Sequence, residues 1–136
     1  MIPRFRGLSI DEDSKGKMQY GYLIADGEQA FIINEVVEAN EQYITIESWC
    51  PVDPKTIGQS TGLKDKNGNE IFEKDILDYN GRKVIVKWHG SYAGFIYEFV
   101  DELQNRTTEW KPLYLSYYHF EIIGNLFENP ELLEVD

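Results

Sequence analysis

The sequence has few cysteines and histidines and lacks a long apolar run. It contains one cysteine, Cys50, and two histidines. A single cysteine excludes a disulfide within the chain and a zinc site made of several cysteines. No apolar run approaches the roughly 20 residues that a membrane-spanning helix requires, and residues 1–6 lack the apolar stretch of a signal peptide. These absences predict a cytoplasmic protein without a membrane partner.

Positive charge is also scarce. The chain has 13 lysines and arginines against 24 aspartates and glutamates, a net charge of −11. Both halves of the chain carry a similar acidic excess. Such a field repels phosphate backbones, which supply most of the affinity for nucleic acids, so direct binding of DNA or RNA is disfavoured. Solubility is the simplest explanation of the acidity. Imitation of DNA is the alternative, and the lysines interspersed among the acids weigh against it.

The residues that are abundant favour a β fold. Hydrophobic residues make up 42% of the 136 residues and aromatic residues 14%, which is sufficient for a packed core. Runs rich in β-branched and aromatic residues alternate with turn signals such as Asp26-Gly27 and Asn80-Gly81. Strands are predicted at 18–24, 30–37, 43–49, 76–79, 83–88, 94–100 and 120–126, and residues 4–8 as a short edge strand. The predicted fold is mainly β, with short antiparallel strands in a small barrel or twisted sheets and little helix.

The chain is predicted to divide at a segment rich in proline and glycine. Pro51, Pro54 and Gly58 indicate a linker. Residues 1–52 are therefore predicted to form a hairpin-rich β subdomain, and residues 53–136 the linker and a small-barrel-like β subdomain. Within the predicted strand 83–88, Trp88 shares a face with two valines and is expected in the core.

The strongest turn signal lies in the middle of the chain, at Asp65-Lys66-Asn67-Gly68-Asn69. Asn-Gly is typical of tight type I′ turns. Asp65, Asn67 and Asn69 also have the spacing of the first ligands of a calcium loop. However, Glu70 occupies the position that should be glycine, and Ile76 the position that should be a bidentate glutamate. The pattern therefore predicts a β-turn rather than a metal site.

Three segments together resemble the YopX family, small proteins encoded by phages and prophages of low-GC Gram-positive bacteria. The segments are residues 2–6 (IPRFR), residues 56–77 (TIGQSTGLKDKNGNEIFEKDIL) and residues 122–133 (IIGNLFENPELL). The resemblance implies a predominantly β fold and a phage-encoded, cytoplasmic protein, and it transfers no catalytic residues. The family usually has glycine where this sequence has Lys74. If that glycine adopts a positive φ, Lys74 must tolerate strain or the turn must differ.

Few side chains carry chemistry. Cys50, between Trp49 and Pro51, is interpreted as a packed thiol, His89 as a turn residue and His119 as part of an aromatic cluster. A zinc site needs three or four ligands that the sequence does not bring together. We therefore assign no catalytic, cofactor-binding or metal-binding residue and no cofactor.

Three functions are compatible with these observations. The first is a non-catalytic binding or assembly module, whose partners are a second copy of the chain or a host or phage protein. Interfaces are enriched in aromatic residues, and aromatic residues recur in this chain at Trp49, Trp88, Trp110, Tyr114, Tyr117 and Tyr118. The others are an acidic, DNA-mimic-type inhibitor of a host protein and an enzyme with an unrecognised site. A pocket with convergent polar groups would favour the enzyme.

Overall fold

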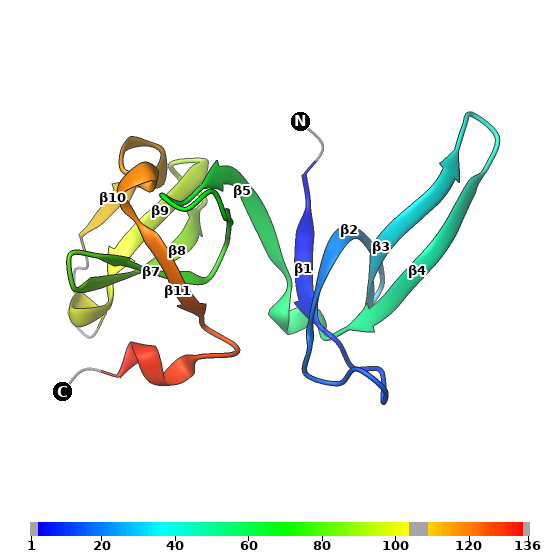
Figure 1. Cartoon of the computed structure of the whole chain (residues 1–136), viewed down its shortest axis with the longest axis horizontal. Coiled ribbons are helices and arrows are strands. Elements are labelled where there is room, and N and C mark those ends of the chain that lie inside the picture. Colours follow the sequence, from blue (N-terminus) through cyan, green and yellow to red (C-terminus); the bar gives the residue numbers. More distant parts are fainter. Residues whose placement is uncertain (1–2, 104–108, 135–136) are drawn as a thin grey trace. The chain divides into compact units, whose positions relative to one another are not determined.

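The computed structural model of the chain describes residues 3–103 and 109–134 (Figure 1). These residues form antiparallel β-strands and short 3₁₀-helices, and no α-helix occurs among them. The strands lie in open, twisted sheets rather than in a barrel, so the predicted mainly β fold is confirmed. None of the helices in the described ranges is long and apolar enough to cross a membrane. Two compact units are present, Met1–Ser60 and Thr61–Asp136.

Unit 1 is an antiparallel sheet with the strand order β4-β3-β2-β1-β5. Its strands are β1 (Phe5–Leu8), β2 (Met18–Asp26), β3 (Gln29–Ala39), β4 (Ile44–Val52) and the first residues of β5 (Gly58–Lys64). Strand β1 pairs with β2 on one side and with β5 on the other. The prediction of an edge strand at residues 4–8 is therefore wrong. Arg6, in the middle of this segment, is buried.

The core of unit 1 lies on one face of the sheet. Its buried residues are Ala30, Ile32 and Val52, and Phe5, Leu23 and Ile57 pack against them. Residues that follow one another along a strand point to opposite faces. Tyr22 and Ile24 flank Leu23 and are exposed on the other face.

The proline-rich segment after β4 is built into unit 1. Pro51 and Val52 belong to β4, and Pro54–Thr56 form the 3₁₀-helix η1. Asp53 caps this helix, since its Oδ1 accepts a hydrogen bond from the Lys55 backbone N–H at 3.0 Å. Thr56 Oγ1 accepts one from the Leu8 N–H at 2.9 Å. The residues predicted as a linker therefore have fixed partners in unit 1.

Unit 2 contains the remaining part of β5, the short strand β6 beside it and a five-stranded antiparallel sheet of order β10-β9-β8-β7-β11. The strands are β6 (Glu70–Phe72), β7 (Asp75–Tyr79), β8 (Arg82–His89), β9 (Gly94–Phe99), β10 (Trp110–Pro112) and β11 (Glu121–Asn125). The 3₁₀-helices are η2 (Val100–Glu102), η3 (Leu113–Leu115), η4 (Tyr117–His119) and η5 (Pro130–Leu133). Asn80 and Gly81, with φ of 52° and 88°, form the β7–β8 turn, so the hairpin prediction is confirmed.

The core of unit 2 collects residues from several of its elements. Its buried members are Ile71, Leu77, Val84, Val86, Tyr97, Leu113 and Phe120. Trp88 is 50% exposed, so its predicted place in the core is wrong. The reason is the position of the core along β8. Val84, Ile85 and Val86 are all buried in the middle of the strand. Trp88 lies next to the C-terminal residue of β8, and its ring packs edge-on against Phe95, with the ring centres 5.1 Å apart.

Lys74, between β6 and β7, adopts a conformation that glycine prefers. Its φ is 72°. The backbone is held there by two hydrogen bonds, from Lys74 N–H to the Val86 carbonyl at 2.8 Å and from Leu126 N–H to the Lys74 carbonyl at 3.0 Å. The ammonium lies 5.3 Å from the centre of the Phe127 ring. The turn is therefore retained with a lysine in it, and the strain is borne by the lysine backbone.

We expect Lys74→Gly to raise the free energy of unfolding by up to about 1 kcal/mol. Left-handed strain of about 1–2 kcal/mol is removed, and the larger entropy that glycine loses on folding offsets part of the gain. Urea denaturation measures the change. Lys74→Ala is the control, because alanine keeps the strain and loses the contact with Phe127. A Lys74→Gly protein less stable than the alanine variant would contradict this account.

Candidate functional site

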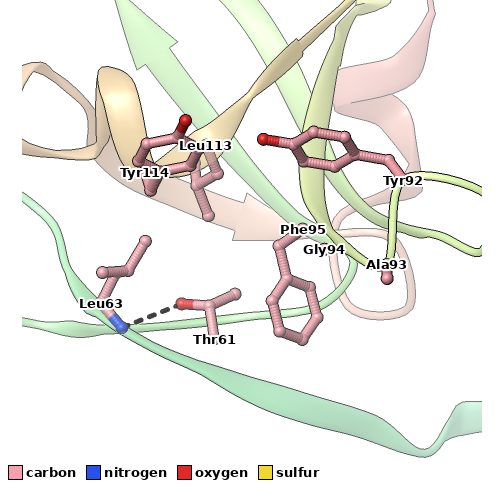
Figure 2. A pocket seen from close by; sticks show the side chains of 8 residues that line it. All are labelled: Thr61, Leu63, Tyr92, Ala93, Gly94, Phe95, Leu113 and Tyr114. Atoms are coloured by element: carbon pink, nitrogen blue, oxygen red, sulfur yellow. Dashed lines mark hydrogen bonds between the residues drawn. The ribbon is translucent and has the colours of Figure 1, made fainter.

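A cavity of about 450 Å³ lies in unit 2 (Figure 2). It is lined by Thr61, Leu63, Tyr92, Ala93, Gly94, Phe95, Leu113 and Tyr114. These residues come from β5, the β8–β9 turn, β9 and η3. Its walls are mainly aromatic and aliphatic, which is typical of a surface that receives an apolar group. We call it the aromatic pocket.

The β8–β9 turn fixes one wall of the aromatic pocket. The Tyr92 backbone N–H donates a hydrogen bond to His89 Nδ1 at 3.0 Å, and the Ala93 N–H donates one to the His89 carbonyl at 2.8 Å. Ala93 has a φ of 58°. His89 is thus the turn residue that the sequence predicted. Its imidazole holds the turn that presents Tyr92.

Two tyrosine hydroxyls face each other across the pocket, those of Tyr92 and Tyr114 (Figure 2). The pKa of Tyr92 is raised above its ordinary value. Desolvation is the largest cause, and the hydrogen bond with Tyr114 and the charge of Tyr114 act in the same direction. Tyr92 is therefore a neutral phenol at pH 7. The third hydroxyl, that of Thr61, is already used, because it donates to the Ile71 carbonyl at 2.7 Å and accepts from the Leu63 N–H at 3.1 Å.

Exposed aromatic side chains continue the surface beyond the aromatic pocket. The Trp110 ring lies 4.6 Å from the His89 ring and 5.1 Å from the Tyr92 ring. Trp110 is 38% exposed and Tyr114 58%. Together with the pocket, His89, Trp110 and the Trp88–Phe95 pair form what we call the aromatic patch. Tryptophan and tyrosine dominate the binding energy of many interfaces.

A second cavity of unit 2, of about 290 Å³, contains the other histidine. It is lined by Tyr79, Tyr97, Phe99, Lys111, Leu115, Ser116, His119 and Phe120. The His119 ring lies 4.2 Å from Tyr118 and 5.6 Å from Tyr79, as expected for a member of an aromatic cluster. The Tyr97 hydroxyl donates a hydrogen bond to Ser116 Oγ at 3.4 Å.

Cys50 is packed inside unit 1, where its side chain is 7% exposed. Its thiol donates a hydrogen bond to Ser9 Oγ at 3.1 Å. Within the two described ranges, no group of three or more histidine, cysteine, aspartate or glutamate side chains is arranged to hold a metal ion.

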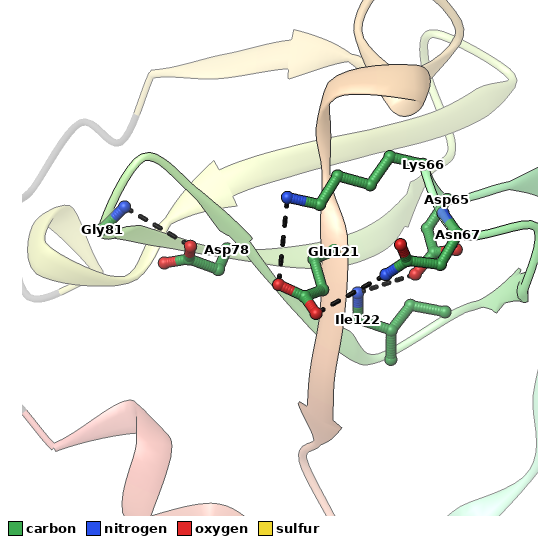
Figure 3. A network of polar contacts seen from close by, with 7 residues as sticks. All are labelled: Asp65, Lys66, Asn67, Asp78, Gly81, Glu121 and Ile122. Carbon is green, nitrogen blue, oxygen red and sulfur yellow. Dashed lines mark hydrogen bonds and ion pairs between the residues drawn. The ribbon is translucent and has the colours of Figure 1, made fainter.

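In the central turn, the Asp65 carboxylate accepts hydrogen bonds from backbone N–H groups (Figure 3). Asp65 is buried; its Oδ1 accepts from the N–H groups of Asn67 and Asn69, at 3.0 and 2.9 Å, and its Oδ2 accepts from the Ile122 N–H at 3.0 Å. Gly68 has a φ of 85°, whereas Asn67 is not left-handed, so the turn is not of type I′. The Asp65 oxygens that a calcium loop would offer to an ion are therefore used by the protein backbone: Oδ1 closes the turn and Oδ2 holds it to β11.

Comparison with known proteins identifies the family. The model of the family described as "YopX protein" matches residues 11–134. Among solved structures, the chain is similar to one described as protein EF1440 from Enterococcus faecalis, with 30% identity and a TM-score of 0.64, over 98% of this chain and 99% of that one. No curated protein matches the chain. The family model covers most of the sequence, and the solved structure has the same fold over nearly its full length. The chain therefore belongs to the YopX family.

Proposed function

We propose that the chain is a non-catalytic binding or assembly module whose binding surface in unit 2 is the aromatic patch. The observation that carries the proposal is the aromatic pocket itself. Its apolar walls offer contact area, and its two phenols offer hydrogen bonds that fix orientation. Such a surface fits an apolar or aromatic side chain of a protein partner.

The lining of the pocket supports binding over the enzyme alternative. A general base works best when its pKa lies near the operating pH. The titratable groups among the lining residues are phenols, and the pKa of Tyr92 is raised further. The lining offers neither a carboxylate nor an imidazole that could take a proton from a substrate.

The partner we propose first is a second copy of the chain. Most assemblies of identical chains are closed and symmetric, so one patch can serve both sides of a contact. The aromatic side chains of the patch are rigid and partly exposed, which favours tight packing at low entropic cost. A host or phage protein is the alternative partner. The setting belongs to the proposal: a phage-encoded protein in the cytoplasm of the bacterial host.

We expect light scattering at tens of micromolar to give a mass of at least about two chains of 15.9 kDa each. Trp110→Ala should weaken the association by roughly 30-fold, as a central aromatic contributes about 2 kcal/mol to an interface. Tyr118→Ala is the matched control, because Tyr118 is 55% exposed and lies outside the patch. A monomer at this concentration would overturn the self-assembly proposal.

Nucleic acid is not among the proposed partners. The net charge of −11 opposes contact with phosphates. The same light-scattering samples, titrated with duplex DNA in a gel-shift assay, should show no complex at physiological salt. A complex that weakens as sodium chloride rises would reveal a local basic surface and contradict this part of the proposal.

A further inference from the structure

The β3–β4 hairpin of unit 1 continues past β2 as a two-stranded arm (Figure 1). Pairing of β2 with β3 ends at Tyr22 and Ile33, whereas pairing of β3 with β4 continues to Ala39 and Ile44. We call residues 35–48 the arm. An isolated two-stranded hairpin is only marginally stable in water. Among the strands that the structure describes, none pairs with the arm as a third strand.

The arm exposes apolar side chains from both strands and from the turn between them. They are Val36, Val37, Tyr43, Ile44 and Ile46. The most exposed is Ile44, at 63%, and Trp49, at the base of the arm, is 58% exposed. Val36 pairs with Ile46 across the two strands. Val37 follows Val36 in β3, so the apolar side chains lie on both faces of the arm. Exposed apolar side chains gathered on one segment are typical of interaction surfaces.

The outer edge of β4 is open along the arm. The hydrogen-bonded order of unit 1 ends at β4. Only the end of β4 is covered, where Ser9 bridges to Val52 and the Ile10 N–H donates to the Pro51 carbonyl at 3.0 Å. In the described ranges, no strand pairs with the outer edge between Ile44 and Trp49. An open edge binds an extended chain segment through main-chain hydrogen bonds.

The charge around this edge is of one sign. Residues 18–54 contain no lysine or arginine, although the two halves of the chain have a similar net charge. The acids in this stretch are Asp26, Glu28, Glu35, Glu38, Glu41, Glu47 and Asp53. Four of them belong to the arm, and all four are exposed. Like charges opposite each other destabilise a strand pair, so a second copy of the chain is a poor occupant of this edge.

We infer that the outer edge of β4 binds an extended, positively charged segment of another protein, in which lysine or arginine alternates with apolar residues. The alternation follows from the edge, since successive side chains of an added strand face opposite sides of the sheet. Basic residues meet the glutamates of the arm, and apolar residues meet its exposed aliphatic side chains. The inference rests on the proposed function in treating the chain as a binding module, and it adds a surface outside the aromatic patch.

The probe is a fluorescent peptide in which valine and lysine alternate. Its length of about eight residues lies within the common range for strands. We expect it to bind the full chain in an anisotropy titration and to weaken as salt rises. A peptide with glutamate in place of lysine should not bind. Hydrogen exchange should slow at residues 44–49 when the valine–lysine peptide is present. Absence of binding, binding of both peptides, or protection only elsewhere would overturn the inference.

Charge-reversal variants test whether the arm itself is responsible. We expect Glu35→Lys combined with Glu47→Lys to weaken peptide binding at least about tenfold. The matched control is Glu131→Lys combined with Glu134→Lys, which changes the net charge equally at exposed positions of unit 2. The control should weaken binding by less than about threefold. Equal weakening by both variants would show attraction by net charge alone and overturn the inference.

Light scattering on the arm variant separates this inference from the proposed function. The arm lies outside the aromatic patch, so the variant should keep the mass of the unmodified chain. If the unmodified chain self-associates but does not bind the valine–lysine peptide specifically, only the arm proposal is removed. A monomeric chain that still binds the peptide at residues 44–49 would remove only the self-assembly proposal.

Discussion

Gly21→Ala is expected to lower the free energy of unfolding by at least about 3 kcal/mol. A Cβ at this position would lie 2.0 Å from the carbonyl oxygen of Ile33 and 2.8 Å from its carbonyl carbon. Both are backbone atoms, so no side chain can move aside. Gly21 pairs with Phe5 of β1, and the next residue, Tyr22, pairs with Ile33 of β3. Relief of the clash therefore requires one of these strand pairs to open.

The measurement is urea denaturation of a chain in which Trp49 is the remaining tryptophan, after Trp88→Phe and Trp110→Phe. Its fluorescence then reports unit 1. Gly27→Ala is the control, because Gly27 also has a positive φ, of 62°, but nothing lies within 4 Å of its Cβ position. The control should cost about 1 kcal/mol. Equal losses for the two variants would show that the close approach to Ile33 is not what requires glycine.

Asp65→Ala is expected to destabilise unit 2 by about 3–5 kcal/mol. The substitution removes the acceptor for the N–H groups of Asn67, Asn69 and Ile122. A hydrogen bond to a charged group contributes about 1.5–3 kcal/mol, and partial access of water to the turn reduces the sum. Loss of the bond to Ile122 also removes one of the contacts that hold β11 to the turn (Figure 3). The effect therefore extends beyond the turn itself.

Asp78→Ala is the control for Asp65→Ala. The Asp78 carboxylate accepts one exposed hydrogen bond, from the Gly81 N–H at 3.4 Å, so its loss should cost less than about 1 kcal/mol. A chain carrying Trp49→Phe reports unit 2 through its two other tryptophans. Similar losses for the two aspartates would mean that the three hydrogen bonds of Asp65 contribute little. Asp65→Asn keeps one acceptor oxygen and should fall between the alanine variant and the unmodified chain.

Local chemistry was the part of the fold that the sequence predicted best. The β7–β8 turn needs two residues that tolerate a positive φ. Asn80 and Gly81 both do so, independently of their tertiary contacts. The strands around it follow from alternation and β-branched content. The alternation failed at Trp88, because it shows which face a residue occupies and not how far along the strand the core extends. The type of the central turn was wrong for a related reason: Asn-Gly fits several turns, and the contact with β11 selects one.

The candidate site depended on contacts that no local pattern reveals. Asp65 binds the backbone of Ile122, 57 residues further along the chain. Tyr92 and Tyr114 meet across a cavity although they belong to different segments. The stretch without lysine or arginine could have been found in the sequence, but a charge count by halves hides it. Its importance appears only when the structure shows that the same residues form an open strand edge.

The burial of Cys50 makes this chain suited to measurements of motion. A thiol reacts with a modifying reagent only when it becomes accessible, and Cys50 is closed off inside unit 1. Its rate of modification under native conditions therefore reports how often that part of unit 1 opens, in the same way as exchange of a protected amide. Because the chain has no other cysteine, every modified molecule records an opening at this position. A cysteine placed on the arm could be labelled in seconds to minutes while Cys50 stays largely unmodified, which would allow the arm to be followed separately.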